Sequence, residues 1–318
     1  MNLNLGKLRV LLVEDLEPMR EIMTYLLTNL GIGEVVSAAN GQHALKLLRS
    51  DYDFDLIITD WEMPVIDGLT LTQTIRKNKA VRINEVPIIL VTGFSSLDRI
   101  AKARDSGVNE YMIKPFNSRD LAKRIEYIIR SPRSFIFDEA YTGPNRRRKS
   151  PDYKGGERRV RKPQKVNNES GLGLQTKVGV GVISDDVIAR AQRAMDENKV
   201  DFYPIASGFL SSFQSAIESV KNEKEPTRRS IENMISPIMQ IKANALVFGY
   251  PKLGEIAGMG LNFLDNLNEI DQFAIMIAEG FYKPMKHMVV NRDDQEEIDM
   301  YHQSIKTELE DACKRYNN

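Results

Sequence analysis

Side chains that could together handle a phosphoryl group occur at wide intervals in the first 120 residues. They are two adjacent acids, a third acid, a hydroxyl and an amine: Glu14 and Asp15, Asp60, Thr92, and Lys114. An aspartate that attacks a phosphorus atom needs positive charge and hydrogen-bond donors around the transferred oxygens. Because a hydroxyl and an ammonium supply such donors, these residue types allow phosphoryl transfer to an aspartate.

These side chains follow short apolar runs that are typical of buried β-strands. The five runs span residues 8–13, 34–38, 55–59, 86–91 and 110–113. Segments with helical periodicity separate them, and this alternation predicts an α/β fold, a doubly wound five-stranded parallel sheet. Right-handed crossovers bring the carboxyl ends of such strands to one edge, so we expect the reactive side chains to meet there.

Three carboxylates at one edge would repel one another unless a cation lay between them. The acids are Glu14, Asp15 and Asp60. Mutual repulsion is relieved by a divalent cation, and a site that offers only oxygen ligands beside a phosphate favours Mg²⁺. The sequence therefore predicts Mg²⁺ as the cofactor.

Four motifs in this region resemble the receiver domain of two-component response regulators, which has a flavodoxin-like fold. They are "LLVEDLEPMR" from residue 11, "LIITDWEMPVIDG" from residue 56, "VTG" from residue 91 and "YMIKPF" from residue 111. The resemblance covers roughly residues 7–130. It implies a protein whose aspartate is phosphorylated by a sensor histidine kinase or a phosphotransfer protein.

The resemblance also implies a role for each matching residue. Asp60 would be the phospho-acceptor, Lys114 would bind the phosphate, and Pro115 would follow a cis peptide bond. Thr92 and Tyr111 match the family's switch pair, in which the hydroxyl moves to the phosphate and the ring rotates inward. The Mg²⁺ ligands would be Glu14, Asp15, Asp60 and the backbone carbonyl of Glu62.

Two further positions, Glu62 and Phe94, stand two residues beyond Asp60 and Thr92. In the family these positions border the route of a hydrolytic water. We interpret an acid and a large ring there as features that slow the loss of phosphate.

Composition and length predict three regions. A chain of 318 residues exceeds one usual core. We expect a receiver domain at 1–130, a basic and largely disordered linker at 131–183, and an all-α helical bundle at 184–318. The linker prediction rests on Pro, Gly, Asn, Arg and Lys with little apolar periodicity.

The predicted linker contains a quasi-repeat, "YTGPNRRR" and "YKGGERRV", rich in arginine. Ten Lys or Arg lie between Arg146 and Lys165, opposed by only two acids. The segment could be solvated, attract nucleic acid without sequence specificity, or bind cyclic di-GMP, because guanidinium groups can stack on guanine and bond its edge. The candidate anion or nucleotide ligands are Arg146, Arg147, Arg148, Arg158 and Arg159.

The stretch "SPIMQIKANALVFGYPKL" resembles the helix of a histidine phosphotransfer (Hpt) domain. Lys242, Phe248 and Gly249 fall where that family places its lysine, a packing residue and a turn, but Met239 occupies the histidine position. A thioether cannot accept a phosphoryl group. We therefore interpret residues 184–318 as a degenerate Hpt-like domain kept for docking or self-association, with a plain helical bundle and an active phosphate carrier as alternatives.

The function we expect is that of a response regulator whose output is binding rather than enzymatic chemistry. Phosphorylation of Asp60 would alter contacts between the helical domain and a downstream protein or a second copy. A phosphorelay carrier or phosphate sink with an active C-terminal half, and a receiver with a nucleotide site in the linker, are the alternatives. The only enzymatic activity expected is self-phosphorylation and hydrolysis at Asp60.

Several other classes are disfavoured by the sequence. Cys313 is the only cysteine, which excludes an internal disulfide and fits a reducing compartment. Basic and acidic side chains balance at 44 each, and no window of 18 residues is apolar and uncharged, so we expect a cytoplasmic protein without membrane insertion. No recognition-helix motif is present, which argues against sequence-specific DNA binding.

Overall fold

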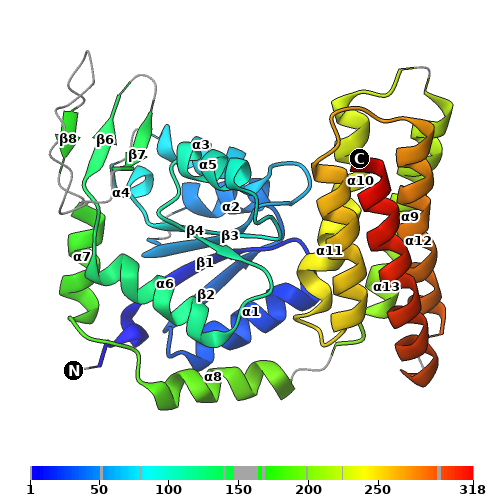
Figure 1. The fold of residues 1–318 in the computed structure, drawn as a ribbon. Helices are drawn as coiled ribbons and strands as arrows, with labels where there is room; N and C mark the ends of the chain where they lie inside the picture. The colour runs from blue at the N-terminus through cyan, green and yellow to red at the C-terminus, as the bar shows by residue number, and fades with distance from the viewer. Residues whose placement is uncertain are drawn as a thin grey trace, which may run out of the picture. The chain divides into compact units, whose positions relative to one another are not determined.

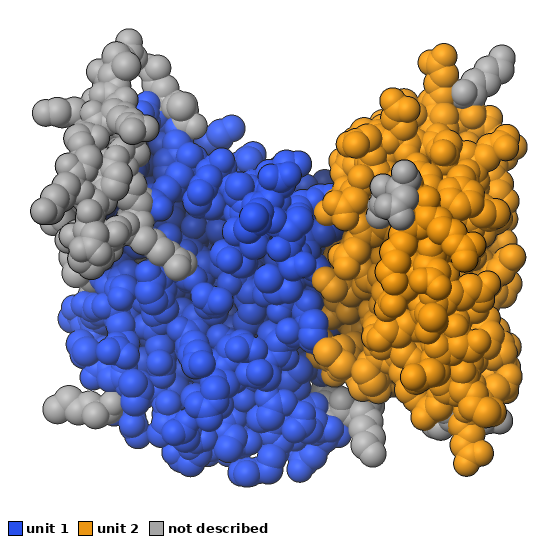
Figure 2. All heavy atoms as spheres, viewed as in Figure 1, with its two compact units in different colours: residues 1–198 blue, residues 199–318 orange. Residues whose placement is uncertain are grey.

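The computed structural model divides the chain into two compact units, residues 1–198 and 199–318 (Figure 2). The parts of the chain that the structure describes are residues 2–50, 53–78, 81–138, 141–146, 164–166, 169–197, 200–223, 225–291 and 295–317.

A five-stranded parallel sheet in the order β2-β1-β3-β4-β5 forms the centre of the first unit (Figure 1). Its strands are β1 (Arg9–Val13), β2 (Glu34–Ala38), β3 (Leu56–Asp60), β4 (Ile88–Thr92) and β5 (Glu110–Ile113). Every residue of β3 and of β4 is buried, as expected for strands covered on both faces. The predicted doubly wound receiver fold and the positions of its five strands are confirmed.

Helices cover both faces of this sheet, with α1 and α6 on one face and α2, α3 and α5 on the other (Figure 1). The helices are η1 (Leu5–Lys7), α1 (Glu17–Asn29), α2 (Gly41–Arg49), α3 (Gly68–Arg76), α4 (Val81–Asn84), α5 (Leu97–Ser106) and α6 (Ser118–Arg130). Side-chain caps begin several of them, for example Asn40 on α2 and Asp67 on α3. The site is expected at the carboxyl ends of the strands, so the helices that follow β1, β3, β4 and β5 start beside it.

Part of the predicted disordered linker is folded. A second, antiparallel sheet has the order β7-β6-β8 and consists of β6 (Phe135–Phe137), β7 (Thr142–Pro144) and β8 (Gln164–Val166). The helix α7 (Glu169–Val178) follows. Phe135 is completely buried under the guanidinium of Arg76, 5.1 Å from the ring centroid. This short apolar run is thus covered by a surface of the first unit that local composition did not reveal.

The boundary between the two compact units also differs from the predicted start of the helical domain at residue 184. Helix α8 (Asp185–Glu197) packs on α1 and α6 within the first unit. Its apolar stripe is buried there and consists of Ile188, Ala191, Ala194 and Met195. An amphipathic pattern identifies the face of a helix that will be buried, but not the surface that buries it. Here α1 and α6 of the first unit cover that face.

The second unit is helical. Its elements are α9 (Tyr203–Asn222), α10 (Arg228–Ala245), α11 (Pro251–Asp265), α12 (Gln272–Val290) and α13 (Gln295–Asn317). Consecutive helices from α9 to α13 pack on one another, and α9 also packs on α12, which closes a bundle. The predicted all-α region is confirmed. Among the described residues, no helix combines the length and apolar character needed to cross a membrane.

Candidate functional site

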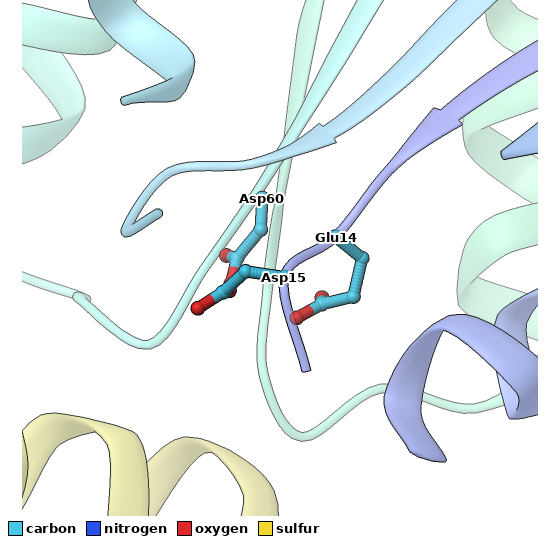
Figure 3. A group of neighbouring side chains, drawn as sticks. All are labelled: Glu14, Asp15 and Asp60. Carbon is cyan, nitrogen blue, oxygen red and sulfur yellow. The ribbon is translucent and has the colours of Figure 1, made fainter. Parts of the chain in front are cut away.

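Three carboxyl groups gather where β1 and β3 end (Figure 3). Glu14 and Asp15 follow β1 directly, and Asp60 is the last residue of β3. One oxygen from each lies within 4.8 Å of the others. The parallel topology predicted this convergence, and the structure brings the three acids together.

Lys114, the residue after β5, extends its ammonium into the same cluster. Its Nζ lies 3.0 Å from Glu14 Oε2 and 3.1 Å from Asp60 Oδ2. The side chain is 1% exposed, and Glu14 and Asp60 are 3% and 4% exposed. The Lys114–Pro115 peptide bond is cis, as the sequence predicted. One buried cation therefore contacts two of the three acidic groups.

The excess of negative charge appears in the acid–base properties of the cluster. Burial, followed by the charge of Asp60, raises the pKa of Glu14 to about 8. The same two causes raise the pKa of Asp15. Burial acts to lower the pKa of Lys114, but the charges of Asp60 and Glu14 outweigh it and raise that pKa. Carboxyl groups whose pKa values are raised in this way have too little positive charge near them to stabilise their ionised form.

This donor set fits a divalent cation. It offers carboxylate oxygens from three residues and no nitrogen or sulfur ligand. Oxygen ligands suit Mg²⁺ and Ca²⁺, and Mg²⁺ is characteristically held by a few carboxylates together with phosphate oxygens. Among the described residues, this is the one group of three or more candidate ligands so arranged.

Backbone geometry keeps the Asp60 carboxylate in place. The Trp61 N–H donates to Asp60 Oδ1 at 2.8 Å, and the Gly68 N–H donates to the Trp61 carbonyl at 2.8 Å. A Cβ at Gly68 would lie 2.2 Å from the Asp60 carbonyl oxygen, so only glycine permits this approach. The loop after β3 thus folds back tightly against the reactive residue.

Sequence reasoning missed Arg20, which braces the acidic loop. Its Nη1 donates to the carbonyl of Glu14 at 2.8 Å and to that of Asp15 at 3.3 Å. Arg20 lies in the first turns of α1, only five residues after Asp15. The short separation along the sequence between this arginine and the acid pair could have suggested that they interact.

Thr92 and Tyr111, the predicted switch pair, lie on the neighbouring strands β4 and β5. Thr92 is buried, and its Oγ1 accepts from the Phe94 N–H at 3.0 Å. Its carbonyl accepts from the Lys114 N–H at 2.7 Å. The Tyr111 ring is half-buried, 5.9 Å from the Arg124 guanidinium. A backbone hydrogen bond therefore links Thr92 directly to Lys114.

Two aromatic side chains, Phe94 and Trp61, pack together beside these residues. Phe94 packs edge-on against Trp61 with 5.8 Å between ring centroids. The guanidinium of Arg99 lies 4.0 Å from the Phe94 ring centroid, a cation–π contact that the sequence did not suggest. Glu62, whose backbone carbonyl was a predicted Mg²⁺ ligand, follows Trp61 in the loop after β3, and its side chain is partly buried.

The other candidate residues lie elsewhere. Arg146 Nη1 is 3.2 Å from Asp105 Oδ1, and its guanidinium stacks on Tyr141 at 3.7 Å from the centroid. Arg147, Arg148, Arg158 and Arg159 lie outside the described residues. In the second unit Met239 is buried, and partial burial lowers the pKa of Lys242.

Comparisons with known proteins agree with this geometry. The family described as "Response regulator receiver domain" matches residues 10–126. The chain is similar to the chemotaxis protein CheY of Pseudomonas aeruginosa, with 36% identity over 121 residues, 38% of this chain and 95% of that protein. It is 34% identical to the chemotaxis protein CheY1 of Helicobacter pylori over 122 residues, 38% of this chain and 97% of that protein.

A solved structure is also similar, that of the chemotaxis response regulator CheY4 of Vibrio cholerae. It shares 29% identity, covers 37% of this chain and 96% of its own, and has a TM-score of 0.35. The matches to the receiver family and to nearly full-length curated relatives coincide with the carboxylate and lysine cluster. The chain therefore belongs, through residues 10–126, to the response regulator receivers of two-component signalling.

Proposed function

We propose that this protein is a response regulator in which Asp60 accepts a phosphoryl group and the phosphorylation state controls protein contacts of the helical unit. The observation that carries the proposal is the buried contact of Lys114 with both Asp60 and Glu14, beside Asp15. A buried lysine shared by two acids is costly in free energy, and such strongly perturbed groups are typical of sites that carry out chemistry.

In the proposed reaction an Asp60 oxygen attacks the phosphorus of a phosphohistidine or of acetyl phosphate. The bond from phosphorus to the donor's nitrogen or oxygen breaks, and Asp60 becomes an acyl phosphate. Lys114 is placed to pair with an oxygen of the transferred group, and the Thr92 hydroxyl would donate to another after leaving its bond with Phe94. The residues of the chain thus orient the group and offset its charge.

Glu14, Asp15 and Asp60, with the Glu62 carbonyl, would hold Mg²⁺ in this reaction. When bound, the ion supplies the positive charge that the cluster lacks and that the phosphoryl oxygens require. The raised pKa values of Glu14 and Asp15 support this assignment because burial and the charge of Asp60 both disfavour the ionised acids, and a bound cation would offset both effects.

The helical unit is proposed as the binding output, Hpt-like in pattern but without the phospho-accepting histidine. Met239 takes the histidine position, and both histidines of the second unit contact carboxylates. His287 Nε2 lies 3.1 Å from Glu297, and His302 Nε2 lies 3.1 Å from Glu255. The phosphate donor would be a histidine kinase or a phosphotransfer protein, and the output partner a downstream protein or a second copy.

The test is to treat the full-length protein with labelled acetyl phosphate and Mg²⁺, with Asp60→Asn as the comparison. We expect one label on residues 1–198, stable in acid and lost in base, as an acyl phosphate is. Asp60→Asn should carry none, and Asp67→Asn, which alters an exposed helix cap in the same loop, should be labelled normally. Label that persists in Asp60→Asn would overturn the assignment.

A further inference from the structure

Helix α8 rests on the two helices that begin at the phosphorylation site. α1 begins at Glu17, just after the acid pair, and α6 begins at Ser118, four residues after Lys114. α8 packs on both of them. It is also the last element of the first unit, joined to α9 of the second unit by residues 198–202. A change in the site can therefore reach α8 through its packing on α1 and α6, and α8 is joined directly to the second unit.

Ser118 is the point of contact on α6. Its N–H donates to Gln192 Oε1 at 2.9 Å, and its Oγ donates to the Ile188 carbonyl at 2.9 Å. The first N–H groups of a helix have no partner within that helix, so α8 completes the start of α6. Ser118 is 1% exposed, so the loss of either bond would leave a buried polar group without a partner. Ile188 and Gln192 are one turn apart and form a matched pair of acceptors.

Two further hydrogen bonds hold the first half of α8 and the chain just before it. The Ile183 N–H, just before the helix, donates to Glu126 Oε1 at 2.5 Å, and Arg190 Nη2 donates to the Asn29 carbonyl at 3.2 Å. The Arg119–Asp185 ion pair is exposed and contributes little. Ser118 is thus a buried polar contact between α8 and the loop that carries Lys114.

We infer that α8 reports the state of Asp60 to the helical unit through the Ser118 contact, an inference that rests on the proposed function. With Asp60 unmodified, Lys114 is held by both Glu14 and Asp60. When Lys114 pairs with a phosphoryl oxygen instead, the loop 114–118 shifts and the two Ser118 bonds lengthen. Docking of α8 on α6 weakens, and the tether to α9 gains freedom.

The experiment is hydrogen–deuterium exchange of the full-length protein in Mg²⁺, with and without beryllofluoride as a phosphoryl mimic. Trp61 emission reports in parallel that the mimic has bound, because Trp61 adjoins Asp60. We expect amides of residues 185–197 to exchange about fivefold faster with beryllofluoride, which is the effect of one lost hydrogen bond on the opening equilibrium. Peptides of α2, which follows β2 and does not begin at the site, should exchange at unchanged rates.

Variants separate coupling from simple stability. Gln192→Ala removes the acceptor of the Ser118 N–H, so 185–197 should exchange faster without the mimic and respond less to it. Arg193→Ala, an exposed change on the same helix, should keep both the basal rate and the response. Equal responses in wild type and Gln192→Ala would overturn the inference.

Two failures are distinguishable. If Trp61 emission responds to beryllofluoride but exchange in 185–197 does not, the inference falls and the proposed phosphorylation stands. If neither responds and Asp60 takes no label, the proposed function fails and the inference fails with it.

Discussion

The ammonium of Lys114 lies 3.1 Å from the Asp60 carboxylate, with both side chains almost fully buried. A buried ion pair is costly to break because the remaining charge has no water to stabilise it.

Lys114→Met should lower the free energy of unfolding by about 3 kcal/mol without Mg²⁺, because Glu14 and Asp60 lose their shared cation. Urea denaturation measures this directly, and added Mg²⁺ should restore more stability to the variant than to the wild type. Lys177→Met is the matched control: Lys177 pairs with Asp55 at 2.6 Å, but its side chain is 36% exposed. It should cost less than about 1 kcal/mol. Equal losses would argue against a special role for Lys114.

Glu14→Gln should weaken Mg²⁺ binding on the order of tenfold, because affinity for hard cations depends on the charge of the ligand set. Trp61 emission provides the titration signal. Glu17→Gln, an exposed change in the first turn of α1, should bind Mg²⁺ as the wild type does. Unaltered affinity in Glu14→Gln would remove Glu14 from the ligand set.

Phe94→Ala should speed the decay of the Asp60 acyl phosphate several-fold. The Phe94 ring is held against Trp61 and beneath Arg99, so its loss opens space for water next to the reactive residue. The rate of label loss in Mg²⁺ is the measurement. Phe137→Ala, in the second sheet, serves as a control for removal of an aromatic ring. An unchanged decay rate in Phe94→Ala would remove the shielding role.

His287→Gln and His302→Gln should leave phosphate labelling unchanged. The Nε2 atom of each histidine is 3.1 Å from a glutamate oxygen, an environment that disfavours a phosphoryl group through charge repulsion. The label should be confined to residues 1–198 in all three proteins. Acid-labile, base-stable label on residues 199–318 would instead support the alternative of an active relay.

Arg146→Ala should not change the response to cyclic di-GMP, because the Arg146 guanidinium is already engaged by Asp105 and Tyr141. Calorimetry at physiological salt with the full-length protein is the measurement, and we expect the same heat for both proteins. Binding heat that disappears in Arg146→Ala would favour the nucleotide alternative and would require the Asp105 contact to break.

Residue types and order were enough to predict the site. Glu14, Asp15, Asp60 and Lys114 each end or follow an apolar strand, and parallel topology leaves one edge where such residues can meet. Arg20 and Gly68 were harder to recognise, because their roles depend on carbonyl positions in the loops. A sequence lists the side chains but does not show where the backbone carbonyls point.

The alternation of strands and helices, the five-stranded sheet, the reactive side chains and the methionine at position 239 could all be read from the order of the residues. The place of α8 in the first unit and the packing of Phe135 under Arg76 emerged only from the folded chain. The reason is physical: local periodicity and residue type act over a few residues, whereas burial depends on which distant surface is complementary. Ser118 and Gln192 are 74 positions apart, and no local pattern marks them as partners.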